Sequence, residues 1–460
     1  MGRSMKKTGL ICLLIILIMS NQTIDAEPDL RSKIGQMIMV GFRGSDVPDT
    51  LAYDLGHRNL GGVLCLAYNL ESPSQIAELT SSLQSYATTP VLVAVDEEGG
   101  YVARLDENNG YEVTHSAYML GSVLNSEDST RSEAGKMAGW LADGGFNVNL
   151  APVVDVNVNP NSPAIGFHER SFSADPAVVY QHAAWYIDEF HERNIMTALK
   201  HYPGHGSAID DSHDGFTDIS HTWTDNELLP YRNLISGGYS DFVMAGHLYN
   251  SLIDDMYPAS LSYDALSILL RDSLQFGGAV ISDAMYMGAI IENYEFDEAI
   301  ETAINAGVDI LLYTTNMRDD RSLPGLIIDI VADKVEQGVI SEDRIDASYE
   351  RIMKLKRAFL NCAPVVNPDE EIIPGAFSLA AYPNPFNSGT TIMFVLNQGG
   401  KVSLELFNIN GQRIKMLVND YFTIGQHRIY LDGTDLPSGI YLVRMQIGQH
   451  ICTNKISLIK

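Results

Sequence analysis

The chain has 460 residues, of which 45% are hydrophobic, and its formal net charge at pH 7 is −28. This length allows two or three domains around one large core, and the hydrophobic fraction is that of a globular protein rather than a disordered one. So acidic a surface repels nucleic acids and anionic lipids, and neither is expected as a partner.

The first 26 residues are typical of a cleaved export signal. Basic residues at positions 3, 6 and 7 precede the apolar run 10–19, which is too short to span a bilayer. Ala26 offers a small residue at the cleavage point, although Ile24 is bulkier than usual there. We therefore predict an exported protein, secreted or attached to the outer surface, with no transmembrane segment in the mature chain. A retained membrane anchor is the alternative.

From residue 34 to 360, short apolar runs alternate with longer amphipathic segments. The runs predicted as strands are 37–42, 62–67, 91–95, 147–154, 196–200, 242–245, 279–282 and 309–313. Parallel neighbours need crossovers, so eight such repeats predict an α/β fold, a (β/α)8 TIM barrel, with catalytic loops at the carboxyl ends of the strands. An open doubly wound sheet is the alternative, but no G-x-G-x-x-G phosphate loop follows the first run.

The composition changes after residue 362. Prolines punctuate an acidic segment at 363–376, which is predicted to be a linker. From 377 to 460, β-rich runs are separated by turn pairs such as Asn410-Gly411 and Asp432-Gly433. This pattern predicts a small C-terminal antiparallel β-sandwich. The predicted organisation is a signal peptide (1–26), a barrel (27–362), a linker (363–376) and a sandwich (377–460).

The densest group of titratable side chains follows the fifth predicted strand. The segment KHYPGHG at 200–206 precedes Asp211 and His213, and its Pro-Gly-His-Gly turn ends any regular element. Such a concentration at the carboxyl end of a barrel strand predicts an active site. A histidine-rich polar loop without a catalytic role is the alternative.

Other predicted strands also end in charged or titratable residues. These are Asp96, Glu97, Glu98 and Arg104 after the third, Asp155, Glu169 and Arg170 after the fourth, His247 after the sixth and Asp283 after the seventh. A lone aspartate there is more often a helix cap, but clusters at matching ends of one barrel converge on one rim.

The histidine spacings match no zinc motif, the four cysteines suggest neither a disulfide framework nor a metal site, and no Gly-x-Ser-x-Gly elbow occurs. No metal or other cofactor is expected.

Acidic and basic side chains around a polar rim suit the hydrolysis of a polyhydroxylated substrate. Glycoside hydrolysis needs a carboxylate to stabilise or trap an oxocarbenium-like centre, and an acid to protonate the leaving oxygen. Asp283 suits the first role. His213 suits the second, because an imidazole titrates near neutrality and Asp211 can orient it and stabilise its charged form.

These motifs resemble glycoside hydrolase family 3, specifically its single-barrel β-N-acetylglucosaminidases, over about residues 30–360. The resemblance is carried by DEEGG at 96–100, APVVD at 151–155, ERSF at 169–172, KHYPGHG at 200–206, DSH at 211–213 and ISDAM at 281–285. It implies a retaining enzyme with Asp283 as nucleophile and His213, paired with Asp211, as acid/base. It also implies a sugar site formed by Asp96, Arg104, Arg170, Lys200 and His201, with His247 as a weaker candidate. Tyr101 is a departure, since many relatives have a basic residue there.

The C-terminal segment resembles the sorting domains of the type IX secretion system, through YPNPFN at 382–387 and LPSGIY at 436–441. The resemblance implies export across an outer membrane with that machinery as a partner, and later removal of the domain or its use for attachment. A carbohydrate-binding β-module is the alternative, because aromatics such as Tyr421 and Tyr430 can stack on sugars.

The sequence therefore predicts an exported retaining exo-β-N-acetylglucosaminidase acting on an N-acetylglucosamine-containing glycan or muropeptide. Within the same family, a β-glucosidase, a β-xylosidase or a phosphorolytic β-N-acetylglucosaminidase remains an alternative. A catalytically inactive sugar-binding protein on the cell surface is an alternative of another class.

Overall fold

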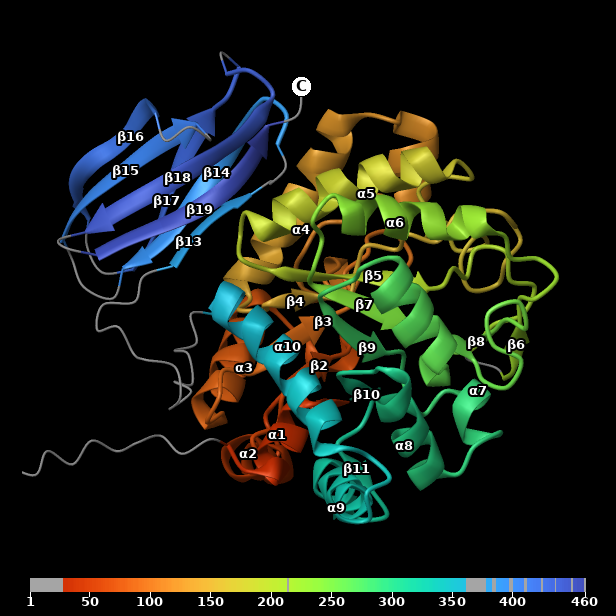
Figure 1. Ribbon diagram of the computed structural model, residues 1–460. Coiled ribbons are helices and arrows are strands. Elements are labelled where there is room, and N and C mark those ends of the chain that lie inside the picture. Colours follow the sequence, from red (N-terminus) through yellow and green to blue (C-terminus); the bar gives the residue numbers. More distant parts are fainter. Residues whose placement is uncertain are drawn as a thin grey trace, which may run out of the picture.

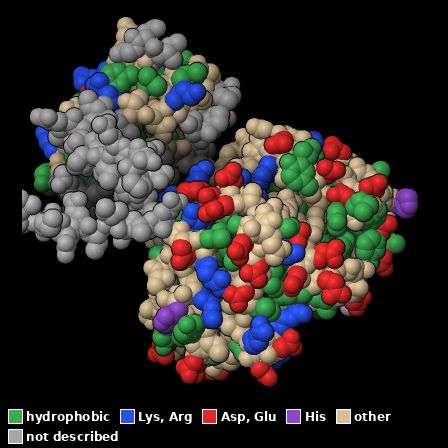
Figure 2. Space-filling model, turned by 60° about the horizontal axis from the view of Figure 1, so that its bottom comes forward, with side chains coloured by type: hydrophobic (Ala, Val, Ile, Leu, Met, Phe, Trp, Pro, Cys, Tyr) green, Lys and Arg blue, Asp and Glu red, His purple; other side chains and the backbone are tan. Residues whose placement is uncertain are grey.

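The computed structural model describes residues 28–212, 215–360 and, apart from short gaps, 378–458. The predicted signal peptide and linker lie outside the described residues, as does His213. On the face drawn in Figure 2, Asp and Glu side chains are spread over the surface, as the net charge of −28 implies.

Parallel strands form a nearly closed barrel sheet at the centre of the first domain (Figure 1). The sheet order is β10-β1-β2-β3-β4-β5-β7-β9, and an isolated parallel bridge between Ile281 and Ile310 brings the two end strands together. The strands are β1 (Ile38–Gly41), β2 (Gly62–Cys65), β3 (Leu92–Val95), β4 (Val148–Asn149), β5 (Met196–Tyr202), β7 (Phe242–Ala245), β9 (Ala279–Ser282) and β10 (Leu311–Tyr313). The prediction of an eight-stranded parallel α/β barrel is thus confirmed at this level.

Helices between the strands surround the sheet (Figure 1). They are α1 (Leu30–Gln36), α2 (Asp49–His57), α3 (Pro73–Tyr86), α4 (Glu127–Asp143), α5 (Pro176–His191), α6 (Leu229–Ser236), α7 (Gly288–Ile291), α8 (Phe296–Ala306), α9 (Leu323–Glu336) and α10 (Glu342–Leu360), with π-helical segments η3 (Met119–Leu124) and η6 (Asp264–Ser273). Local sequence sets where they begin: Asp175 accepts a hydrogen bond from the Ala177 amide, and Pro176 opens α5. Short two-residue ladders, β6 (Thr217–Asp218) with β8 (Leu248–Tyr249) and β11 (Met317–Arg318) with β12 (Arg321–Ser322), lie in the loops.

One strand is shorter than its apolar run predicts. The run 147–154 gives only the two-residue β4, although the Ala151 carbonyl still accepts a hydrogen bond from the Ala198 amide. Pro152, which follows, has no amide hydrogen to donate. The chain returns to the sheet at Val153, which forms an isolated bridge with Lys200. This detour carries Asp155 to the carboxyl end of the barrel, beside β5.

The C-terminal domain consists of two antiparallel sheets. One has the order β13-β14-β17 and the other β16-β15-β18-β19. The strands are β13 (Ser378–Tyr382), β14 (Gly389–Leu396), β15 (Gly400–Asn408), β16 (Arg413–Phe422), β17 (Gly425–Asp432), β18 (Gly439–Ile447) and β19 (His450–Leu458). Side chains from both sheets, such as Phe394 and Leu404, share one buried apolar core, which is the arrangement of a sandwich. The runs that the sequence predicts as strands here, 390–396, 402–407, 413–418, 427–431, 440–446 and 451–458, correspond to the six strands β14 to β19, whereas no run was predicted at β13.

Candidate active site

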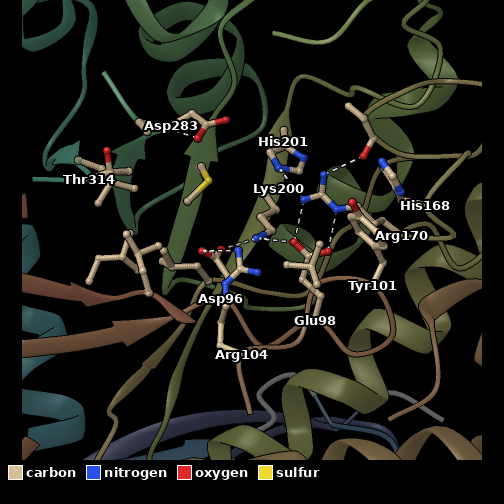
Figure 3. A pocket seen from close by; sticks show the side chains of 18 of the residues that line it. Asp96, Glu98, Tyr101, Arg104, His168, Arg170, Lys200, His201, Asp283 and Thr314 are labelled. Carbon is tan, nitrogen blue, oxygen red and sulfur yellow. Dashed lines mark hydrogen bonds and ion pairs between the residues drawn. The ribbon is translucent and has the colours of Figure 1, made fainter. Parts of the chain in front are cut away.

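A cavity of about 410 Å³ lies at the carboxyl ends of the barrel strands. Its polar lining comes from loops after several strands and comprises Asp96, Glu98, Tyr101, Arg104, His168, Arg170, Lys200, His201, Asp211, Asp283 and Thr314. Figure 3 shows Asp283 on one side of the cavity and the Glu98–Arg170 pair on the other. A cavity of this size lies in the range of small-molecule sites, about 300–1,000 Å³.

A network of buried ion pairs forms one wall of the cavity. The Lys200 ammonium lies 2.8 Å from Asp96 Oδ1 and 2.7 Å from Glu98 Oε1. Arg170 donates to both oxygens of Glu98, from Nε at 2.8 Å and from Nη2 at 2.7 Å. Such two-point pairing fixes the guanidinium plane as well as its position. The wall therefore presents rigid donors and acceptors to a ligand.

The charges in this network stabilise one another. Burial acts to raise the pKa of Glu98, but Arg170 and Lys200 outweigh it and hold that pKa well below its usual value. Burial likewise acts to lower the pKa of Lys200, but Asp96 and Glu98 raise it above the ordinary value. Both groups are thus charged at neutral pH. Arg104 completes the group, with Nη2 at 3.9 Å from Asp96 Oδ2.

His201 is oriented by a buried carboxylate behind it. Asp155 accepts from the His201 amide at 3.0 Å and from its ring Nδ1 at 2.8 Å, and also from the His205 amide at 2.8 Å. Burial acts to raise the pKa of Asp155, but His201 holds it below the usual value, so the carboxylate is ionised. With Nδ1 committed to Asp155, a neutral His201 ring presents Nε2 as an acceptor, 3.3 Å from Arg170 Nη2.

The two carboxylates predicted to take part in catalysis, Asp283 and Asp211, line the same cavity. Asp283 directly follows β9, and its amide donates to the Ala245 carbonyl at 2.9 Å. Its Oδ1 accepts from the Ala284 amide at 2.7 Å, which limits the rotation of the carboxylate. Asp211 comes from the loop after β5, two residues before His213.

His247, the weaker candidate for the sugar site, is buried and is not among the residues that line the cavity. Its Nδ1 lies 2.7 Å from Ser260 Oγ, and its Nε2 lies 3.1 Å from the Ala284 carbonyl oxygen. His247 therefore supports the turn that carries Asp283, from behind the cavity wall. The other sugar-site candidates, Asp96, Arg104, Arg170, Lys200 and His201, all line the cavity.

Comparison with protein families accounts for this constellation. Residues 29–355 match the model of the glycosyl hydrolase family 3 N-terminal domain. The chain belongs to glycosyl hydrolase family 3. It is accordingly a glycoside hydrolase, and the cavity at the carboxyl ends of its strands is the candidate catalytic site of a family 3 enzyme.

Individual relatives agree with this assignment. The chain is 30% identical over 403 residues to a protein named Beta-hexosaminidase A from Pseudoalteromonas piscicida, which covers 77% of this chain and 67% of that protein. It is 33% identical over 283 residues to a Beta-hexosaminidase from Tolumonas auensis, covering 61% and 83% of the two chains. A solved family 3 β-N-acetylglucosaminidase from Paenibacillus sp. superposes with a TM-score of 0.68 at 30% identity, covering 77% of this chain and 70% of that one.

The C-terminal sandwich has its own match. Residues 380–460 match the model of a secretion system C-terminal sorting domain, so this family 3 enzyme carries a signal for secretion at its C-terminus. Among the residues that the structure describes, none of the helices combines the length and the apolar character needed to cross a bilayer.

A buried glutamate beneath the site gives a prediction about pH and stability. Glu97 Oε2 accepts from the amides of Arg104 and Leu105 at 2.8 and 2.9 Å, and burial raises the pKa of Glu97 to about 8. In the unfolded chain this carboxyl titrates near 4.3, so between about pH 4.3 and 8 only the folded state keeps the proton. Folding stability then decreases as pH rises through this window, at up to about 1.4 kcal/mol per pH unit.

Glu97→Gln removes this pH-dependent contribution to folding stability, because the uncharged amide resembles the protonated acid. We expect the melting temperature of the variant minus that of the unmodified enzyme to increase between pH 5 and 8 and to stay constant above pH 8. Calorimetry measures both temperatures. Glu78→Gln makes the same charge change at an exposed position of α3 and serves as the control. A pH-independent difference for Glu97→Gln would show that the carboxyl is ionised in the folded enzyme.

Proposed function

We propose that this family 3 enzyme is an exported, retaining exo-β-N-acetylglucosaminidase that releases terminal β-linked N-acetylglucosamine. The observation that carries the proposal is that Asp283 and Asp211 line one cavity of about 410 Å³. Asp283 lies across this cavity from the Glu98–Arg170 pair (Figure 3). The substrate class is supported by the relatives named β-hexosaminidase and by the neighbour described as a β-N-acetylglucosaminidase.

The proposed reaction has two steps. In the first, Asp283 attacks the anomeric carbon and forms a glycosyl-enzyme ester, while the His213 imidazolium, oriented by Asp211, protonates the departing oxygen. In the second, the neutral His213 takes a proton from water as that water attacks the same carbon and displaces Asp283. Two inversions return the sugar with its original β configuration.

The other cavity residues hold the sugar in this proposal. Lys200 and Arg170 offer N–H donors to hydroxyl oxygens, and Asp96 accepts from hydroxyl groups. Arg104 and His201 extend the same wall. Because these groups are already paired with one another, little reorganisation is needed when the sugar binds, which favours an oriented attack by Asp283.

The export route is part of the proposal. The C-terminal sorting domain and the sequence of residues 1–26 together support passage first through the inner membrane and then through the type IX system. We propose that residues 1–26 are removed, that 363–376 link the two domains, and that the sandwich is either cleaved or used for surface attachment.

Product analysis with the full mature chain tests the activity. We expect turnover of the 4-nitrophenyl β-glycoside of N-acetylglucosamine to exceed that of the matching glucoside and xyloside by at least about 100-fold, since a site built around one substituent discriminates strongly. Proton NMR during the first minutes should show the β-anomer. Faster glucoside or xyloside cleavage, or initial α-anomer, would contradict the proposal. Sugar 1-phosphate formed on addition of phosphate would identify a phosphorylase, and binding without turnover would identify a sugar-binding protein.

A further inference from the structure

A second hollow of about 470 Å³ lies beside the catalytic cavity. Tyr101 and His168 line both spaces, so these two side chains lie at the boundary between the two hollows. The wall of the catalytic cavity formed by Lys200 and Glu98 is buried, whereas Tyr101 is 66% exposed. Tyr101 therefore stands at the open mouth of the cavity, and the second hollow begins there.

Aromatic rings form a ridge along the second hollow, and two of them, Tyr101 and His168, also line the catalytic cavity. The Tyr101 ring stacks on His168 with centroids 3.8 Å apart and an interplanar angle of 16°, and Phe167 meets His168 edge-on at 5.1 Å. Phe167 is 71% exposed. Large aromatic side chains that are held rigidly yet left in solvent are typical of binding surfaces. The apolar face of a sugar ring is a natural partner for them.

The frame of the second hollow is fixed by short-range contacts. Gly100 has φ 63°, and a Cβ there would lie 2.6 Å from Ser116 Cα, so this close approach requires glycine. Ser116 Oγ donates to Glu169 Oε2 at 2.7 Å, and the Tyr118 amide donates to the Glu169 carbonyl at 3.1 Å. These contacts join the loop that bears Tyr101 to the segments around 116 and 169. The hollow is thus preformed.

The lining charge restricts the kind of ligand. Glu169 is acidic, His115 and His168 contribute imidazole rings, and neither lysine nor arginine is among the described residues that line this hollow. An anionic ligand would meet the carboxylate of Glu169, and no lysine or arginine among these lining residues would offset that charge. An uncharged ring with hydroxyl groups matches both the aromatic ridge and the polar lining, which includes Thr114 and Ser116.

We propose that this hollow, with the ridge of Tyr101, His168 and Phe167, is a subsite for an uncharged sugar ring on the leaving-group side of the scissile bond. The inference rests on the proposed function, because it takes the deep cavity as the place of the terminal sugar. The rest of the glycan must then leave through the mouth, where Tyr101 stands. An uncharged β-linked oligosaccharide, such as a chito-oligosaccharide, is the substrate class that fits both hollows.

The test compares two substrates that differ only beyond the scissile bond. One is the methyl β-glycoside of N-acetylglucosamine, whose leaving group carries no ring, and the other is the β-1,4-linked trisaccharide of N-acetylglucosamine. We expect Phe167→Ala to lower kcat/KM for the trisaccharide about tenfold and to change kcat/KM for the methyl glycoside less than about twofold. Tyr101 also lines the catalytic cavity, so Tyr101→Ala is judged by the ratio of the two kcat/KM values, trisaccharide over methyl glycoside, which should fall about tenfold. Tyr86→Ala, an exposed tyrosine at the end of α3, is the matched control and should change neither.

Equal losses on both substrates, or no loss on the trisaccharide, would overturn the subsite. Calorimetric binding of the trisaccharide to the Asp283→Ala enzyme, with and without Tyr101→Ala, gives the same comparison in the absence of turnover. If the proposed function is wrong, the unmodified enzyme should turn over neither substrate. The difference in trisaccharide affinity between Asp283→Ala and the Asp283→Ala, Tyr101→Ala double variant would still show whether the subsite exists.

Charge preference is measured with a disaccharide whose second ring carries a carboxylate, compared with its uncharged analogue. We expect the uncharged disaccharide to be cleaved faster at low salt, and Tyr101→Arg to shift the ratio toward the carboxylate-bearing one by about tenfold. A preference of the unmodified enzyme for the anionic disaccharide would overturn the assignment of an uncharged ligand.

Discussion

Asp283→Ala is expected to lower kcat for the 4-nitrophenyl β-glycoside of N-acetylglucosamine by about 10³–10⁵-fold, because it removes the carboxylate that we propose attacks the anomeric carbon. The fold should persist, since Asp283 is only partly buried and its amide hydrogen bond to the Ala245 carbonyl does not involve the side chain. Initial rates and the melting temperature together measure the two properties. Near-normal turnover would show that Asp283 is not the nucleophile.

Two controls separate a lost nucleophile from a damaged cavity. Azide is small enough to take the place of the missing carboxylate, and an α-glycosyl azide should accumulate with Asp283→Ala, because a single displacement inverts the anomeric carbon. Asp272→Ala, an exposed aspartate on η6, should leave kcat within about twofold.

The proposed acid/base residue, His213, should behave differently from the proposed nucleophile, Asp283. His213→Ala is expected to slow methyl glycosides far more than 4-nitrophenyl glycosides, because a good leaving group needs little proton donation. Asp283→Ala should slow both equally. A His213→Ala enzyme that is equally slow on both substrates would contradict the proposed division of roles.

The barrel was predictable because its strands are short apolar runs bounded by clear breaks. The runs 242–245 and 279–282 coincide with β7 and β9, and Gly246 and Asp283 mark their ends. The extent of β4 was not predictable from hydrophobicity, since backbone pairing rather than burial ends it at Asn149. The strand β13 follows a stretch rich in proline and acidic residues, which hid it from the apolar pattern.

The members of the candidate site were predictable, but their pairings were not. Parallel strands bring their carboxyl ends to one rim, which is enough to gather Asp96, Lys200 and Asp283 around one cavity. Sequence does not tell which of two adjacent carboxylates faces that cavity. Glu97 turns inward and its pKa is raised to about 8, whereas Glu98 lies between two cations and its pKa is lowered.

A buried aspartate at the other end of the barrel has a role in stability instead. Asp309 precedes β10, at the amino end of the strand, whereas the cavity lies at the carboxyl ends. Its Oδ2 accepts from Arg271 at 2.6 Å, and its Oδ1 from Arg344 at 3.2 Å, Arg351 at 3.1 Å and Ser348 at 2.6 Å. Burial acts to raise the pKa of Asp309, but the arginines hold it below its usual value. This one carboxylate thus connects η6 and α10 to the seam where β9 and β10 close the barrel.

Asp309→Asn is expected to lower the free energy of unfolding by about 3–5 kcal/mol, because it leaves Arg271, Arg344 and Arg351 close together without their counter-ion. For a domain of this size, that corresponds to a fall in melting temperature of roughly 10 °C. Urea unfolding at pH 7 measures the difference, with Asp272→Asn on the surface of η6 as the matched control.

At 25 °C, kcat per folded molecule of the Asp309→Asn variant should stay within about twofold of that of the unmodified enzyme, since Asp309 is remote from the cavity. A loss below about 1 kcal/mol would mean that the arginines find other partners, and a large loss of kcat with normal stability would place Asp309 in catalysis rather than in barrel closure.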